Sequence, residues 1–158
     1  MDFSKMVAEL ELQPHPEGGF YRETYRSEGG CEVPGLGWRN YSTAIYYLLV
    51  EGNYLAFHRI RQDEIWHFYY GQPVKLHIID QSGNYRLVRL GHNLDNEQAL
   101  QWVVPAGCWF AAHVERDYAL VGCTVSPGFD FSDFELARRS ELIQSFPQHS
   151  DLIEQFTR

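Results

Sequence analysis

The chain has 158 residues and a mass of 18.4 kDa, which is the size of a single domain. Asp and Glu outnumber Lys and Arg by 21 to 13, and the resulting net charge of −8 disfavours a nucleic-acid partner, because such proteins place cations on phosphates. A hydrophobic content of 44%, with 15% aromatic residues, excludes general disorder.

Two further features bear on the compartment. The longest apolar stretch, Ala44 to Val50, is far shorter than the roughly 20 residues of a membrane-spanning helix. The three cysteines are odd in number and lack CxxC spacing, so we expect a reduced, cytoplasmic protein in which Cys108 and Cys123 are buried as small apolar groups.

The N-terminal segment predicts one helix and one strand. Apolar residues recur on one face over Ser4–Leu12, and a helix there must end before Pro14. A loop rich in proline and glycine follows, and the alternation over Phe20–Ser27 predicts a strand. Residues 31–40 contain Pro34 and two glycines and are expected to form an irregular loop.

Short strands with turn residues between them fill the middle of the chain. The gaps are too short for the crossovers that parallel strands require, so an all-β, mainly antiparallel sandwich or barrel is predicted. The expected strands are rich in Val, Ile and aromatic residues: Tyr41–Val50, Tyr54–Ile60, Glu64–Tyr70, Val74–Asp80, Tyr85–Leu90, Ala99–Val104, Trp109–Val114 and Tyr118–Ser126.

The C-terminal part is predicted to be helical. Ser132 and Glu135 have the spacing of a capping box, so we expect a helix that begins near Ser132 and stops at Pro147, with a further turn or two over Ser150–Phe156. The predicted layout is one domain over residues 1–158, comprising a helix (1–13), a barrel (14–127) and a helical tail (128–158).

The stretch from Phe57 to Gly71 holds the most chemically informative residues. His58 ends one expected strand and Glu64 begins the next, so a tight turn places both at the same end of a barrel. A histidine beside a carboxylate can act as an acid or base near neutral pH. The alternative is a buried, hydrogen-bonded structural pair, since a buried carboxylate needs a partner.

This stretch resembles the first motif of the cupin superfamily, G-x5-H-x-H-x3,4-E-x6-G. The residues at its conserved positions are Gly52, His58, Glu64 and Gly71, while Ile60 stands where the second histidine belongs.

Part of the second cupin motif is present as well. Pro105-Ala106-Gly107 matches its P-x-G turn, but Phe110 occupies the histidine position and Val114 the asparagine position. Five segments in order between Leu12 and Leu142 are similar to an uncharacterised branch of single-domain cupins.

The resemblance implies a single antiparallel jelly-roll (cupin) barrel that binds a small molecule in its interior and forms a homodimer, with the Phe20–Ser27 strand as the element that adds to an edge. Many cupins bind a divalent metal ion through three histidines and one glutamate. Here only His58 and Glu64 remain at those positions, and His67 is the further candidate ligand, although strand alternation puts it on the face opposite Glu64 unless a bulge intervenes.

Several other residues are candidates for the pocket. Arg22 and Thr24, if they face the interior, could hold a carboxylate or phosphate; the alternative is that Arg22 forms a surface ion pair. Tyr46 or Tyr47 is the candidate acid, and His15 and Glu17 lie in the rigid loop nearby. The candidate aromatic walls of the pocket are Trp66, Phe68 and Phe110.

Three functions are compatible with these residues. The first is an isomerase or epimerase that acts on a small polar, sugar-like metabolite, with His58, Glu64 and Tyr46 as catalytic residues. The second is a ligand-binding or sensor protein without chemistry. The third is a divergent metalloenzyme that uses His58 and Glu64 with either His67 or His77.

Overall fold

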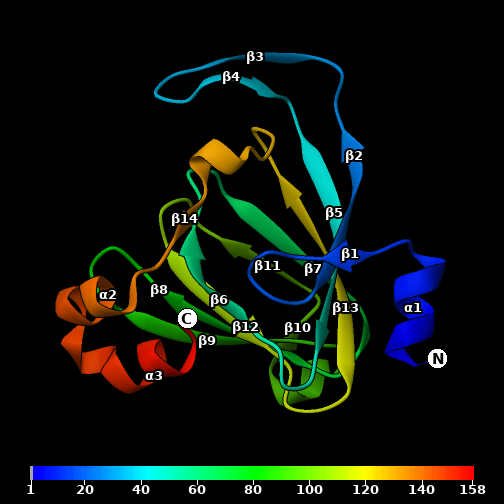
Figure 1. Cartoon of the computed structure of the whole chain (residues 1–158), viewed down its shortest axis with the longest axis vertical. Coiled ribbons are helices and arrows are strands. Elements are labelled where there is room, and N and C mark those ends of the chain that lie inside the picture. The colour runs from blue at the N-terminus through cyan, green and yellow to red at the C-terminus, as the bar shows by residue number, and fades with distance from the viewer. Residues whose placement is uncertain (1) are drawn as a thin grey trace.

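The computed structural model describes residues 2–158, and within them two six-stranded sheets face each other as a jelly-roll barrel (Figure 1). The first sheet contains, in order, β1 (Gln13–Pro14), β2 (Phe20–Arg26), β5 (Thr43–Val50), β13 (Tyr118–Val125), β7 (Glu64–Gly71) and β11 (Gln101–Val104). The second contains β10 (Gln98–Ala99), β9 (Tyr85–Leu90), β8 (Val74–Ile79), β12 (Trp109–His113), β6 (Leu55–Arg59) and β14 (Glu135–Leu136).

The pairing confirms the predicted all-β, mainly antiparallel fold. Among the described strands only β10 and β9 run parallel. The predicted strand Ala99–Val104 is divided, because the chain leaves the second sheet after β10 and joins the first as β11. Short 3-10 turns complete the connections: η1 (Leu94–Asn96), η2 (Phe131–Asp133) and η3 (Pro147–His149).

The main core lies between the two sheets, where alternate side chains of each strand meet. On β5, Tyr47 and Leu49 point into this core, while Leu48 packs on the outside against Met6 of α1 (Phe3–Glu9). Strands of the first sheet are therefore apolar on both faces at this end, one face filling the barrel and the other covered by α1.

The outer face of the second sheet is covered by α2 (Arg139–Ser145) and α3 (Ser150–Gln155), which lie together on the side of the barrel away from α1 (Figure 1). Ile153 and Phe156 are buried there against Phe57 and Trp109. The backbone N–H of Phe57 also donates to the carbonyl of Phe156 at 2.9 Å, so the end of the chain is fixed to the barrel.

This packing predicts that Phe156→Ala lowers the free energy of unfolding by about 3–5 kcal/mol, because a large ring that is 3% exposed would leave a cavity. For a domain of this size, the Tm should fall on the order of 10 °C. Thermal and urea unfolding measure the loss. The matched control is Leu94→Ala, at a side chain that is 61% exposed, and an equal loss in both variants would contradict the packing role of Phe156.

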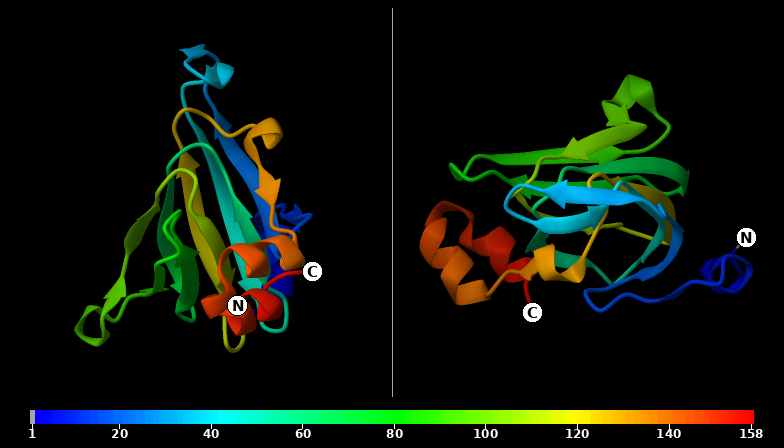
Figure 2. Two further views of the ribbon diagram at one scale, coloured as in Figure 1. Left: turned by 90° about the vertical axis from the view of Figure 1, so that its left-hand side faces the viewer. Right: turned by 90° about the horizontal axis from the view of Figure 1, so that it is seen from above.

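Residues 31–40 form a hairpin, which corrects the expectation of an irregular loop. β3 (Gly30–Val33) pairs with β4 (Gly37–Asn40), and the hairpin projects beyond the two sheets (Figures 1 and 2). The reason is the turn: Pro34 and Gly35 (φ 81°) occupy its centre, and the N–H of Leu36 closes it on the carbonyl of Val33 at 3.0 Å. Pro34 and Gly35 thus form the turn that joins two antiparallel strands.

The expected helix start at Ser132 is also wrong. The backbone N–H of Ser132 is bound by the Asp130 carboxylate at 2.9 Å in η2, and the chain continues extended as β14, which pairs with β6. The helix begins only at Arg139. The pairing of β14 with the edge of the second sheet therefore overrides the local capping pattern. The predicted helical turns over Ser150–Phe156 are confirmed as α3.

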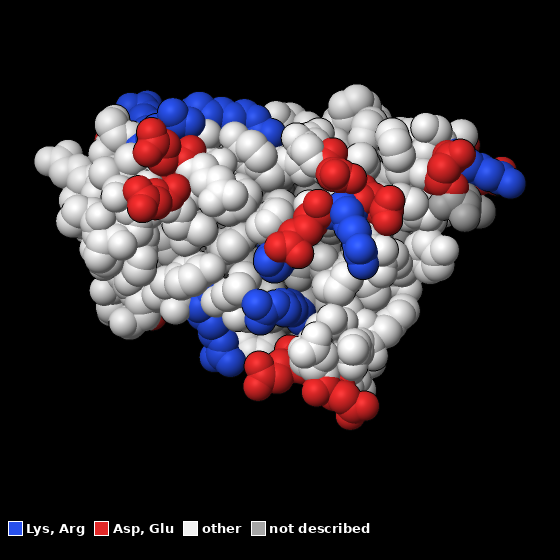
Figure 3. Space-filling model, turned by 90° about the horizontal axis from the view of Figure 1, so that it is seen from below, with Lys and Arg blue, Asp and Glu red and all other residues white. Residues whose placement is uncertain are grey.

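Two surface observations complete the fold. Within residues 2–158, no helix has the length and apolar character needed to cross a membrane. On the face opposite the β3–β4 hairpin, basic and acidic side chains lie in small groups beside one another over a largely uncharged surface (Figure 3). This face therefore carries no broad area of one charge.

Candidate functional site

A cavity of about 320 Å³ lies inside the barrel, toward the end from which the hairpin projects. The first sheet contributes β1, β2, β5, β7 and β13 to its wall, and the second contributes β6. Residues 127–134, here called the mouth segment, add Phe129, Phe131 and Phe134. The cavity wall is therefore mainly apolar, with aromatic rings and several polar groups, as is usual for small-molecule sites.

His58 on β6 lines this cavity in a fixed, neutral state. Its Nδ1 lies 2.8 Å from the carbonyl oxygen of Ala56, so Nδ1 carries the proton and donates it, which leaves Nε2 as an acceptor. Its ring contacts Phe110 and Phe134, with centroids 4.1 and 5.2 Å away. Burial lowers the pKa of His58 to about 4, so the ring is uncharged at neutral pH.

Glu64, the first residue of β7, also lines the cavity and hydrogen-bonds to the thiol of Cys123 on β13. Its accessible surface faces the cavity, and desolvation by the surrounding walls raises the pKa of the carboxyl from 4.5 to about 7. The buried state predicted for Cys123 is confirmed. Glu64 is therefore a carboxyl group that can gain or lose a proton near neutral pH.

His15 also lines the cavity. The sequence indicates that its loop lies near the pocket, but it does not identify His15 as a catalytic residue. Its Nδ1 accepts the backbone N–H of Glu17 at 3.0 Å, so its proton lies on Nε2, the reverse of His58. The ring stands edge-on to Tyr21 and Tyr47, with centroids 4.9 and 5.3 Å away. Burial lowers the pKa of His15 to about 4. The feature of the sequence that points to His15 is the segment Pro-His-Pro-Glu-Gly-Gly, whose prolines and glycines indicate a rigid loop.

The loop that carries His15 is held by Tyr47, whose hydroxyl donates to the carbonyl of Gly18. Gly18 and Gly19 have φ of 107° and 76°, in the region that favours glycine. A Cβ on Gly18 would overlap the carbonyl oxygen of Tyr54. Glycine is thus required where this loop presses against the strand ends, and it brings His15 to the cavity.

Gly18→Ala is expected to lower the free energy of unfolding by about 2–5 kcal/mol, since backbone strain adds to a steric clash. Gly52→Ala is the matched control, because Gly52 also has a positive φ of 78° but has open space around it. The control should lose only about 1–2 kcal/mol, the strain alone. Urea unfolding of both variants measures the difference, and equal losses would mean that the clash is relieved without disturbing the loop.

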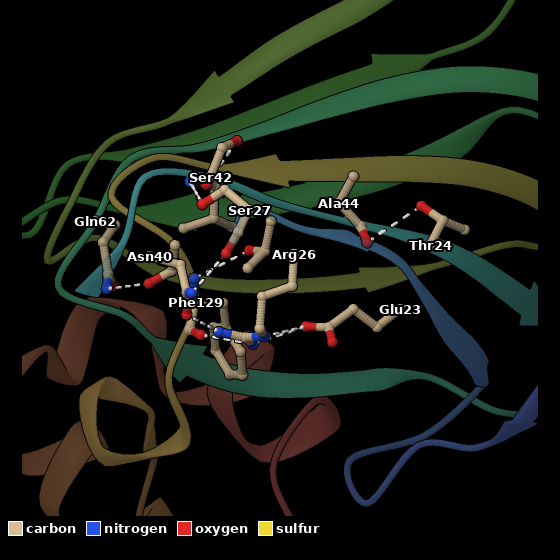
Figure 4. A network of polar contacts seen from close by, with 12 residues as sticks. Glu23, Thr24, Arg26, Ser27, Asn40, Ser42, Ala44, Gln62 and Phe129 are labelled. Atoms are coloured by element: carbon tan, nitrogen blue, oxygen red, sulfur yellow. Dashed lines mark hydrogen bonds and ion pairs between the residues drawn. The ribbon is translucent and has the colours of Figure 1, made fainter. Parts of the chain in front are cut away.

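A hydrogen-bond network joins three segments at the cavity mouth (Figure 4). The Nη2 of Arg26 donates to Glu23 at 2.7 Å and to the carbonyl of Phe129 at 3.0 Å, and its Nη1 donates to Asn40 at 2.8 Å. The N–H of Phe129 donates in turn to the hydroxyl of Thr43 at 3.0 Å. The end of β2, the hairpin and the mouth segment are therefore tied together.

A second set of contacts anchors the mouth segment through Asp133. Its carboxylate accepts from Arg39 of β4 at 2.7 and 2.8 Å and from Gln62 at 2.7 Å. The hydrogen bonds with Arg39 and Gln62 hold the pKa of Asp133 below its usual value. This carboxylate thus links the mouth segment to the hairpin and to the turn between β6 and β7.

The structure brings together five of the candidate residues named from the sequence, which all line the cavity: His15, Tyr47, His58, Glu64 and Trp66. Two more belong to the core around it and do not reach the cavity surface, since Phe110 packs on His58 and Phe68 packs on His92.

Arg22, Thr24 and Tyr46 lie outside the cavity, which corrects the interpretation in which they face the interior. His67 also lies outside the cavity, on the face that strand alternation predicted. Arg22 stands over the Tyr46 ring and pairs with Glu11 at 2.8 Å, as its alternative interpretation predicted. Thr24 sits in a β-bulge and donates to the carbonyl of Ala44.

His67 meets the hydroxyl of Thr124 at 2.9 Å, outside the barrel. Successive side chains of a strand point to opposite faces of the sheet. For this reason, the residues adjacent in sequence to Arg22 and Tyr46 face the interior of the barrel. The cavity-facing neighbours are Tyr21, Glu23 and Tyr47.

The residues present do not fit the metal site that the cupin fold implies. Ile60 and Phe110 occupy two of the four ligand positions, and His67 lies on the opposite face of β7 from Glu64. Across residues 2–158, no three His, Cys, Asp or Glu side chains gather in a geometry that could hold an ion. The divalent metal ion considered from the sequence therefore has no assembled ligand set.

The jelly-roll topology, with a cavity between its two sheets, is that of a single-domain cupin. Residues 4–137 match the cupin superfamily (DUF985), and the chain belongs to this family. An uncharacterised protein of Saccharomyces cerevisiae is 29% identical over 144 residues, which are 82% of this chain and 72% of that protein.

Solved structures agree with this assignment. A hypothetical protein from Leishmania major superposes with a TM-score of 0.95 at 32% identity, covering 99% of each chain. A protein from Shewanella oneidensis does so with a TM-score of 0.92 at 38% identity, covering 100% of this chain and 98% of that one. Oxalate decarboxylase from Bacillus subtilis shares the fold alone, with a TM-score of 0.61 at 14% identity over 95% of this chain and 37% of that one.

Proposed function

We propose that the protein binds a small polar metabolite in the barrel cavity and moves a proton on it, as an isomerase or epimerase. The observation that supports this most strongly is Glu64, a carboxyl inside the cavity whose pKa is raised to about 7. Enzymes tune a catalytic carboxyl into this range so that it serves as base and acid at neutral pH.

In this proposal, the Glu64 carboxylate takes a proton from a carbon beside a carbonyl group of the substrate. The bond electrons pass into an enolate, and the carboxylic acid so formed returns the proton to the former carbonyl carbon, while the proton of the adjacent hydroxyl moves to the former carbonyl oxygen, which completes an isomerisation. An epimer forms when water instead delivers a proton to the original carbon from the opposite face, and Glu64 passes its proton to solvent. His58 acts as a hydrogen-bond acceptor at Nε2 for a substrate hydroxyl, because its Nδ1 is already bound to Ala56. Tyr47 is an unsuitable acid, since its hydroxyl is committed to Gly18 and burial raises its pKa well above the usual value.

Deuterium exchange tests this function. A ligand found by thermal-shift screening is incubated in D₂O with the protein, and the proposal predicts deuterium at a carbon position of the recovered ligand. Proton abstraction by Glu64 is the step that allows this exchange. A ligand that binds and is recovered without carbon-bound deuterium would contradict the enzyme and would support the second candidate.

That second candidate is a binding or sensor protein. It is favoured by the low basicity of both cavity histidines, whose pKa values are about 4. Ligand stabilisation of the fold without any exchange or product is its expected result.

We also propose a homodimer. Within residues 2–158, β1 covers only Phe20 and Tyr21 on one edge of β2, and the edge from Arg22 to Arg26 has no strand beside it. Uncovered edges of this kind are commonly paired by a second chain. Light scattering after gel filtration should give twice the 18.4 kDa chain mass, and a mass of one chain at micromolar concentration would contradict the dimer.

A further inference from the structure

The charges on the cavity wall restrict what it can bind. Among the described residues 2–158, Arg26 is the only Lys or Arg that lines the cavity, and two carboxyl residues, Glu23 and Glu64, line it as well. A buried anion is stable only where a cation or several hydrogen-bond donors compensate it. The availability of Arg26 therefore decides whether an anionic ligand can be held.

Arg26 is not available. Its Nε and Nη2 both donate to Glu23, at 3.1 and 2.7 Å, and Nη2 also donates to the carbonyl of Phe129. Its Nη1 donates to Asn40 at 2.8 Å (Figure 4). All three guanidinium nitrogens are engaged by the protein, and the charge is neutralised by Glu23. The fork that would bind a phosphate or carboxylate is thus already occupied.

The remaining polar groups of the cavity are uncharged. The Nδ1 of His15 accepts a backbone N–H, so that ring is neutral and carries its proton on Nε2. His58 has the opposite arrangement, with Nε2 as an acceptor. The indole N–H of Trp66 is buried and meets no acceptor within the described part of the chain. These groups, together with the Gln13 amide and the Thr43 hydroxyl that also line the cavity, supply uncharged hydrogen-bond donors and acceptors that match hydroxyl and carbonyl oxygens.

We infer that the cavity selects an uncharged, hydroxyl-rich ligand and rejects the phosphorylated or carboxylated forms of the same compound. This inference rests on the proposed function, because it names the substrate class of the same site. A neutral sugar or polyol can exchange hydrogen bonds with His15, His58 and Trp66, and its apolar faces can pack on the aromatic wall. A phosphate would lie beside two carboxyl groups and find no free cation.

Matched ligand sets test the inference. Monosaccharides are supplied in three forms each, as the neutral sugar, its 6-phosphate and its uronic acid, and binding is measured by calorimetry at pH 7.5. The neutral member is expected to bind on the order of 10-fold or more tightly than its charged counterparts, a difference of about 1.4 kcal/mol. Glu23→Gln frees the Arg26 guanidinium and should reduce this preference, while Glu135→Gln, at a carboxylate that pairs with Arg59 outside the cavity, should leave it unchanged.

The outcomes separate the two proposals. Tighter binding of the 6-phosphate or the uronic acid to the wild-type protein would overturn the selection of neutral ligands and leave proton transfer standing. Failure of every member of every set to bind would overturn the proposed function, and this inference with it. Binding of neutral members without deuterium exchange would support the ligand class and contradict only the catalysis.

Discussion

Replacing Glu64 with glutamine is expected to stabilise the protein, and to stabilise it more at pH 8 than at pH 5. The pKa of Glu64 rises from 4.5 to about 7 on folding, so the folded state holds the proton more tightly than the unfolded state. The stability associated with the protonated carboxyl is complete below pH 4.5 and is lost as the pH rises toward 7. Glutamine keeps the shape of the side chain and carries no charge to bury.

The size of the gain follows from the same shift. Glu64→Gln should raise the free energy of unfolding by at most about 3 kcal/mol at pH 8, and by less than about 1 kcal/mol at pH 5. Water in the cavity reduces both values. His15 and His58 titrate near pH 4 and do not obscure this window.

Urea unfolding of wild type and variant at several pH values measures this gain. Glu135→Gln is the control, because it removes an exposed carboxylate that pairs with Arg59 outside the cavity. A Glu64→Gln variant that is less stable than the wild type at pH 8, or whose gain is the same at pH 5 and pH 8, would show that the carboxyl is better solvated than its surroundings indicate.

The same substitution is expected to slow turnover by about 10²–10⁴-fold, the usual contribution of a general acid–base group. The neutral amide can still accept a hydrogen bond from the Cys123 thiol but cannot take a proton. In the wild-type enzyme, kcat/KM should change with pH around an inflection near 7, and that inflection should be absent from the residual activity of the variant.

The control for turnover lies on the same strand. His67→Gln changes a titratable residue on the outer face of β7, where the ring contacts Thr124, and it should leave both the rate and its pH dependence unchanged. Loss of activity in His67→Gln but not in Glu64→Gln would place the chemistry on the outer face of the first sheet and contradict the cavity as the active site.

Much of the fold could be predicted because strand signals are local. The β9 range, Tyr85–Leu90, matches the prediction, and the other long strands differ by one or a few residues at their ends. The signals that misled were also local. Pro34 and Gly35 occupy the centre of a hairpin turn, and the N–H of Ser132 donates to Asp130, two residues earlier in the chain. In both cases pairing with another strand decided the secondary structure, and such pairing cannot be derived from the local composition of the segment.

The candidate site was predictable as far as His58 and Glu64, because their spacing around one turn fixes their proximity to the same cavity. The sequence did not reveal which side chains of β2 and β5 face the interior of the barrel. Outward residues such as Phe20 and Leu48 are as apolar as inward ones, since they pack in the cluster beneath α1. Hydrophobicity therefore cannot distinguish Tyr46 from Tyr47, and only the packing of α1 reveals that Tyr47 faces the interior.

The anchoring of the mouth segment through Asp133 has a consequence for the kinetics of ligand exchange. Phe129, Phe131 and Phe134 line the cavity, and the contacts of Asp133 with Arg39 and Gln62 hold the segment that carries these rings, so that they should resist any movement that ligand passage requires. A ligand inside the barrel touches the rings but not these contacts. Weakening them should therefore speed arrival and departure together and leave the dissociation constant nearly the same, so that the hairpin governs residence time while the cavity governs affinity.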